Sequence, residues 1–252
     1  MSPESLRIDL SDFPTPAKEV GAGQRKDPPG HTPGRVLSRG LRWATLLLFL
    51  GILPFFTLIR VSVFLFQRYE LNSWLSLVGG ASATLLLLSF YLAVVSFRLG
   101  GRGRVPGPLM KGTGILVGAY CLFTLLYLSA GNAKTDEVRI TYTSLNPLLR
   151  VGVSTLLLVD RDGVLTATSR AGEDYSAWGL PTNESSLHIP QEDGYVYAVD
   201  IRTVGRPEWR NRIVTLYFRA MGFGTLRHVG TADHLHVFLP PPGREQRLNA
   251  GG

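Results

Sequence analysis

Three long apolar stretches constrain the fold of this 252-residue chain more than any other feature. They run roughly from Leu41 to Phe66, from Trp74 to Phe97 and from Gly112 to Ala130. An α-helix needs about 20 mainly apolar residues to cross the hydrocarbon core of a bilayer, and each stretch is close to that length. The sequence therefore predicts three transmembrane helices within residues 41–130, with the lipid bilayer as a partner.

Basic residues are distributed unevenly around these spans. Lysines and arginines precede the first span and fill the loop between the second and third, whereas the loop between the first two has only Arg68, offset by Glu70. Basic loops stay in the cytoplasm. We therefore expect a chain in the inner (cytoplasmic) membrane, with a cytoplasmic N-terminus and a C-terminal domain in the periplasm or wall space.

The same topology accounts for the net charge of +7. The chain has no RNA-binding signature and no interleaving of aromatic and basic residues, so nucleic acid is not an expected partner. Its single cysteine, Cys121, lies inside the third span. Disulfides within the chain and a cysteine-ligated metal site are thereby excluded, which leaves histidine and carboxylate side chains as ligands.

Small residues and one arginine interrupt the apolar spans. The patch from Gly79 to Ala83 would let another helix approach closely. Gly114 and Gly118 form a GxxxG pair that suits helix packing within one monomer or between two, so the oligomeric state stays open. Arg60 is expected to extend towards the nearer interface.

The remaining segments differ in composition from the spans. Residues 1–40 are rich in proline, glycine and charge and are expected to be a disordered cytoplasmic tail. Residues 134–241 have globular composition and the length of one small domain, followed by a flexible tail over 242–252. Within the domain the patterns predict a small α+β fold with an antiparallel sheet. We expect helices over 151–158 and 209–221 and strands over 164–168, 195–201 and 234–239.

Two histidines and an aspartate in apolar, strand-like settings are candidate metal ligands: His188, Asp200 and His236. Three such ligands can close three corners of a tetrahedral zinc site and leave the fourth for water. Asp233, three residues before His236, is a candidate base for that water.

Ordinary roles remain open for each of these residues. His188 follows serines and could lie on the surface, Asp200 could end its strand as a partner of Arg202, and Asp233 could cap a turn. His228 lies in a polar stretch and is assigned no function.

Five short motifs in this order resemble a superfamily of zinc peptidases. They are Thr168-Ser169-Arg170, Ser186-Leu187-His188, Ala198-Val199-Asp200-Ile201, Gly222-Phe223-Gly224 and Asp233-His234-Leu235-His236-Val237. The superfamily includes zinc D-Ala-D-Ala carboxypeptidases, phage L-alanyl-D-glutamate endolysins, murein endopeptidases and Hedgehog-type domains. The resemblance covers about residues 142–240, which is the C-terminal domain only.

The resemblance implies that the three candidate ligands hold Zn²⁺. It gives Asp233 the role of general base. It implies that Arg170 is the cation that binds a substrate carboxylate or stabilises the tetrahedral oxyanion. It also implies that His234 is a site residue that is not a ligand. The segment from Ile189 to Tyr195 is longer than its counterpart in the superfamily. This segment either loops out and leaves the site intact or displaces His188.

We therefore expect a membrane-anchored zinc metallopeptidase that acts on peptidoglycan stem peptides, as a carboxypeptidase or an endopeptidase. The alternative is a catalytically inactive, peptidase-like module that binds cell-wall fragments or a protein partner.

Overall fold

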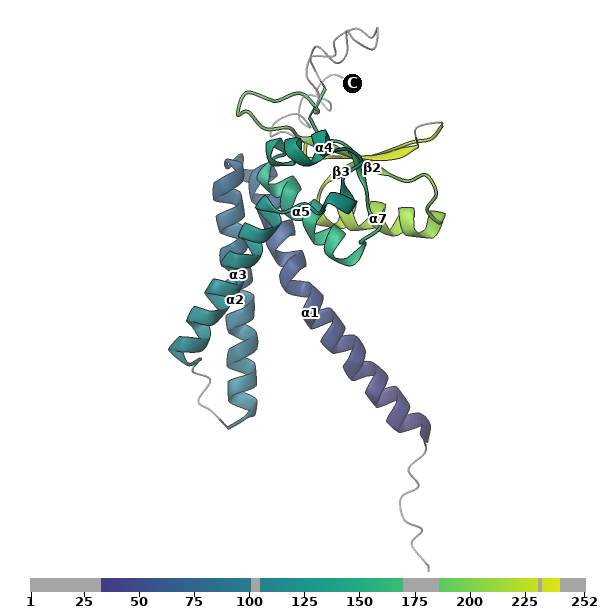
Figure 1. Ribbon diagram of the computed structural model, residues 1–252. Helices are drawn as coiled ribbons and strands as arrows, with labels where there is room; N and C mark the ends of the chain where they lie inside the picture. The colour runs from purple at the N-terminus through teal and green to yellow at the C-terminus, as the bar shows by residue number, and fades with distance from the viewer. Residues whose placement is uncertain (1–32, 101–104, 170–185, 231–232, 241–252) are drawn as a thin grey trace, which may run out of the picture. The chain divides into compact units, whose positions relative to one another are not determined.

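A computed structural model describes residues 33–100, 105–169, 186–230 and 233–240 (Figure 1). The chain divides into two compact units, Met1–Leu46 and Leu47–Gly252. The second unit contains most of the membrane helices and the C-terminal domain. Its architecture confirms the predicted fold class, because three long apolar helices precede a small domain with a four-stranded antiparallel sheet.

The three apolar helices are α1 (Pro33–Tyr69), α2 (Ser73–Arg98) and α3 (Gly107–Leu126). Thr45–Tyr69 in α1 and the whole of α2 and α3 are long and apolar enough to cross a membrane. Helix α1 already begins at Pro33, so residues 33–40 of the predicted tail are helical; proline is tolerated in a first helical turn. The rest of both predicted tails, residues 1–32 and 242–252, lies outside the described residues.

The predicted small-residue patch is a contact between α1 and α2. A side chain at Gly80 would overlap the Ser62 side chain and the Leu58 carbonyl of α1, so glycine permits the close approach. The GxxxG pair behaves differently. Among the described residues, nothing beyond their own helix lies within 4 Å of a Cβ placed at Gly114 or Gly118.

Helix α5 (Pro147–Val159) connects the membrane helices to the domain. Asn146 precedes it, accepts a hydrogen bond from the Leu148 amide and donates to Ser73 Oγ at the start of α2, over 2.6 Å. Ten of its 13 residues are buried. Helices α2, α3 and α7 (Glu208–Met221) all pack against it. This apolar helix begins four residues before the predicted helix, because Asn146 and Pro147 form a favourable helix start.

The C-terminal end of α3 is completed by side chains from the domain. Ser154 Oγ donates to the Thr124 carbonyl over 3.0 Å, and Arg150 Nη1 donates to the Leu125 carbonyl over 2.9 Å. The last carbonyls of a helix have no partner within the helix. The buried donors of α5 satisfy two of them and attach the domain to α3.

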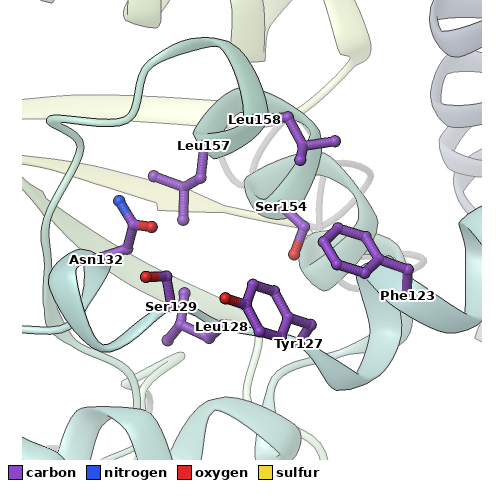
Figure 2. Close-up of a pocket in the computed structure, with 8 residues that line it drawn as sticks. All are labelled: Phe123, Tyr127, Leu128, Ser129, Asn132, Ser154, Leu157 and Leu158. Carbon is purple, nitrogen blue, oxygen red and sulfur yellow. The ribbon is translucent and has the colours of Figure 1, made fainter.

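A pocket lies at this junction of α3 and α5 (Figure 2). Asn132 closes one side, where its Nδ2 donates to the carbonyls of Arg161 and Gly163. These bonds tie the 3-10 turn η2 (Ala130–Asn132) to the segment after α5. The lining residues are Phe123, Tyr127, Leu128, Ser129, Asn132, Ser154, Leu157 and Leu158.

Four strands form the antiparallel sheet, in the order β1-β2-β4-β3. They are β1 (Leu165–Ala167), β2 (Ala198–Arg202), β3 (Gly224–His228) and β4 (His234–Phe238), and short helical turns α4 (Asp136–Ile140) and η3 (Thr141–Ser144) precede α5. Alternation along β2 and β4 buries Val199, Ile201, Leu235 and Val237 on one face. Helix α7 packs against β3 and β4 and runs along one side of the sheet (Figure 1).

Strand β3 was not predicted. Its sequence, Gly-Thr-Leu-Arg-His, is polar and partly exposed, and it lies at an edge of the sheet. An edge strand needs little apolar surface, so the period-two pattern that indicates a strand is weak there.

Gly222 ends α7 at a contact with α1. Its φ is +98°, and a Cβ there would overlap the guanidinium of Arg60 and approach Val63 Cγ1 to 2.9 Å. Gln67 Nε2 donates to its carbonyl over 3.1 Å. The expectation for Arg60 is thereby refined, because its guanidinium lies at the C-terminus of α7, where a helix favours positive charge.

We predict that Gly222→Ala lowers the thermal unfolding temperature of the detergent-solubilised chain more than Gly205→Ala does. Both positions have positive φ, +98° and +77°, so both variants lose about 1–2 kcal/mol from the backbone alone. Only at Gly222 would the added Cβ also clash with atoms of α1, since nothing lies within 4 Å of a Cβ at Gly205. Equal shifts in the two variants would contradict the contact with α1.

Candidate metal centre

The polar face of the sheet brings two predicted ligands together. Asp200 on β2 and His236 on β4 are direct cross-strand partners, and Arg202 is paired with His234 one step along the same face. Side chains of such partners are close neighbours. His236 Nδ1 lies 2.8 Å from Asp200 Oδ1.

His188 joins this pair from a loop before β2. Its Nδ1 lies 2.7 Å from the carbonyl oxygen of Thr168, and a carbonyl can only accept, so Nδ1 carries the proton. Nε2, on the other side of the ring, faces the other two residues, 3.3 Å from Asp200 Oδ1 and 3.3 Å from His236 Nδ1. A backbone carbonyl that orients a histidine in this way is typical of metal ligands.

The three ligand atoms have the spacing of a small coordination site. They are separated by 2.8, 3.3 and 3.3 Å. Ligands 2.0–2.2 Å from a tetrahedral zinc lie roughly 3.3–3.6 Å from one another. His188 and Asp200 are only 3% and 2% exposed, so their facing lone pairs need a shared proton or cation in place of water. The group can hold a metal ion.

The environment keeps the central carboxylate ionised. Burial raises the pKa of Asp200, but hydrogen bonds from His188 and His236, together with the positive charge these rings can carry, outweigh it and hold the pKa well below its usual range. A carboxylate must be deprotonated to bind a metal. Asp200 is therefore in the ligand form at neutral pH.

The long segment after His188 loops out and leaves His188 in the cluster. The Tyr197 amide donates to the Leu187 carbonyl over 2.9 Å, and the Gln191 amide donates to the Tyr195 carbonyl over 2.9 Å. Gly194, with a φ of +78°, makes the turn between them. Because the loop closes on its own backbone, its extra length does not displace the ligand that precedes it.

Two more histidines lie beside the ligands on the polar face. His234, predicted as a site residue that is not a ligand, has its Nε2 3.8 Å from Asp200 Oδ2. The ring of His228 stacks on that of His234, with centroids 4.7 Å apart, and lies 6.1 Å from the ring of His236. Sequence reasoning assigned no role to His228 because β3 was not recognised. Its spacing of six residues from His234, across a glycine-containing turn, is the signal that could have placed it.

In the described part of the chain, Asp233 is paired with residues other than the three ligands. The carboxylate of Asp233 accepts hydrogen bonds from Arg227 over 2.6 and 2.9 Å and from Thr203 over 2.7 Å. Arg227 on β3 is the cross-strand partner of Leu235, so by strand alternation it belongs to the apolar face and not to the face of the ligands. The hydrogen bonds from Arg227 and then Thr203 lower the pKa of Asp233 to about 2. Arg170 lies outside the described residues.

Arg202, two residues after Asp200, adds a positive charge to the polar face. It lines a pocket with Arg206, which precedes α7, and with Arg210 in its first turn. Arg206 and Arg210 both pair with Asp160, which partly neutralises them. Arg202 nevertheless places a positive charge about 7 Å along the strand from the ligand Asp200, since the two are two residues apart.

The centre has the parts needed to activate water, since two imidazoles and a carboxylate can hold a cation and leave further positions open. Comparisons with protein-family models, with curated proteins and with solved structures find no match. The geometry of these residues and the order of the motifs are therefore the basis for assigning a function.

We predict that His236→Ala abolishes tight binding of a divalent transition metal by the purified full-length chain, because two ligands remain. His228→Ala is the matched control, since it removes a neighbouring ring from the same face without removing a ligand. Elemental analysis after dialysis should give one ion per chain for the unaltered protein and for the control. Stoichiometric metal in the His236 variant would show that the ligand set is wrong.

Proposed function

We propose that this protein is a membrane-anchored, zinc-dependent peptidase that acts on the stem peptides of peptidoglycan. One observation carries the proposal: Nε2 of His188, Oδ1 of Asp200 and Nδ1 of His236 converge within 3.3 Å of one another. Two histidines and one carboxylate with an open position are typical of catalytic zinc sites, whereas structural sites are closed by four protein ligands. The five ordered motifs of zinc peptidases add support.

Zinc bound by these ligands would polarise the scissile carbonyl and lower the pKa of the attacking water. The chain's own residues supply the remaining functions. Thr168 fixes the ring of His188 through its carbonyl, and His234 lies beside Asp200, where it can donate to a developing oxyanion. Arg170 is proposed to hold a substrate carboxylate.

Asp233 is proposed to take the proton from the attacking water and pass it to the leaving amine. Its carboxylate is ionised, but its ion pair with Arg227 makes it a weak acceptor. The proposal therefore requires that this pair opens when substrate binds. Hydrogen bonds of catalytic groups are commonly reorganised between the free enzyme and the substrate complex.

The proposed substrate lies outside the cytoplasmic membrane, and the loop charges favour a domain on that side. The domain contacts the start of α2 through Ser73 and the end of α3 through Leu125. Both ends lie on the side of the short loop between α1 and α2. That loop has little basic charge, as expected for an extracytoplasmic loop.

We predict that a reporter fused after Gly252, of a kind that fluoresces only in the cytoplasm, stays dark in cells. The same reporter fused to the α2–α3 loop should fluoresce, because that loop is basic. Fluorescence from the fusion after Gly252 would invert the topology and remove peptidoglycan as a substrate.

We predict that Asp233→Asn leaves zinc content intact and lowers turnover of a stem peptide by roughly 100-fold or more, the scale of general-base loss. Arg227→Gln is the matched control, because it breaks the same ion pair but leaves the carboxylate free to accept a proton. If Asp233 is the base, the control retains activity. Similar losses in both variants would mean that the ion pair is structural and that the base is elsewhere, with His234 the next candidate.

The second candidate function is a catalytically inactive module that binds wall fragments or a protein. The observation in its favour is the pairing of Asp233 with Arg227, which directs the expected base away from the ligands. The zinc-loaded full chain should be incubated with stem peptides and with intact sacculi. Retention of metal and of binding, with no hydrolysis of any substrate, would select this alternative.

A further inference from the structure

Helix α7 has apolar side chains on two opposite faces. Val214, Phe218 and neighbouring residues are buried against the sheet and α5. Trp209, Ile213 and Leu216 are spaced by four and three residues, so they form one stripe on the other side. Their exposed fractions are 62%, 55% and 68%. A contiguous stripe of large apolar side chains on a small domain marks an interaction surface.

The attachment of α7 to α1 shows at what depth this stripe lies. Gly222, which ends α7, contacts Arg60 and Val63 and accepts from Gln67. The apolar segment of α1 continues to Tyr69. These contacts therefore lie roughly 3–14 Å before its end, at a rise of 1.5 Å per residue. The segment has 25 residues, so at about 37 Å it exceeds a hydrocarbon core of about 30 Å. The end of α7 is therefore at the boundary between headgroups and acyl chains.

Helix α5 links α7 to the membrane helices at a second place. Tyr120, six residues before the end of α3, hydrogen-bonds to Thr155 in α5 over 2.6 Å. The end of α5 beyond this contact exposes Val159. Tyr217 of α7 donates to the Gly152 carbonyl of α5 over 2.8 Å, and α5 also packs against α2 and α3, so α5 joins α7 to the membrane helices.

Two arginines border the stripe, and one of them, Arg212, lies 3.7 Å from the carboxylate of Glu208. Arg212 and Arg219 are exposed and occupy positions next to the stripe on the helix surface. Their long apolar stems can follow the stripe while the guanidinium groups reach phosphate. Tryptophan is also enriched at the level of lipid headgroups. A basic border around apolar anchors suits anionic lipid.

We propose that α7 is an interfacial helix that lies on the bilayer, with Trp209, Ile213 and Leu216 inserted at the headgroup boundary. The sheet then lies between the bilayer and the metal centre, because α7 covers the apolar face and the ligands are on the other face. Under the proposed function, this orientation presents the centre to peptides of the wall rather than to peptides attached to lipid.

The test measures depth in the full chain with Cys121→Ala as background, reconstituted into vesicles of phosphatidylethanolamine and phosphatidylglycerol. A nitroxide label is placed by Ile213→Cys, Leu216→Cys or, as control, Val229→Cys. Val229 is 84% exposed, next to the turn between β3 and β4. Collisions with membrane-dissolved oxygen should exceed those with a water-soluble nickel chelate at residues 213 and 216, and the order should reverse at residue 229.

Collision ratios at residues 213 and 216 equal to that at 229 would overturn the proposal. Protection of both from oxygen and from nickel would overturn it in favour of a protein partner. As a second arm, Ile213→Asp should reduce the oxygen collisions of a label at residue 216, whereas Val229→Asp, next to the turn between β3 and β4, should not. Neither arm uses metal or substrate, so failure here is distinct from failure of the proposed peptidase function.

Discussion

Helix α5 is the element on which the rest of the molecule depends, because an apolar helix must be covered on all sides. Ten of its residues are buried, and α2, α3 and α7 all pack against it. Arg150 and Ser154 of α5 donate to carbonyls at the end of α3. Asn146, which caps α5, donates to Ser73 Oγ at the start of α2. The coverage of α5 thus sets where the domain lies on the membrane helices.

The sheet positions two of the candidate metal ligands on the face that is not buried by this packing. Period-two alternation gives it one face that must be buried and one that can carry polar groups. The apolar face is covered by α7, and the polar face carries Asp200 opposite His236. His188 completes the group from outside the sheet, with its ring orientation set by the Thr168 carbonyl. Burying two imidazoles and a carboxylate is unfavourable for each alone, and their mutual interactions or a shared cation offset that cost.

The proposed chemistry and the proposed membrane contact use opposite faces of the same small sheet. In the proposed arrangement, α7 would link the apolar face to the bilayer, and the polar face would lie on the side away from it. The pair formed by Asp233 and Arg227 lies at the margin between these faces, where β4 begins. The pair is closed in this structure, and the proposed peptidase activity requires it to open.

The sequence alone determined the three membrane helices, because length and hydropathy are local properties of a segment. It also determined that Asp200 and His236 lie in strands, since the alternation around each is evident within five residues. Their identity as one group with His188 came from motif order. Only the tertiary structure decided that the loop from Ile189 to Tyr195 closes on itself, because backbone hydrogen bonds between its ends have no sequence signature.

The structure likewise decided the roles of β3 and Asp233. An edge strand with little apolar surface has no strong pattern, so neither β3 nor the position of His228 beside His234 could be read from composition. The direction of Asp233 depends on the backbone where it enters β4 and on Arg227 across the turn. A carboxylate three residues before a ligand can face either side of a strand entry, and the partner available on each side, which is a tertiary property, decides between them.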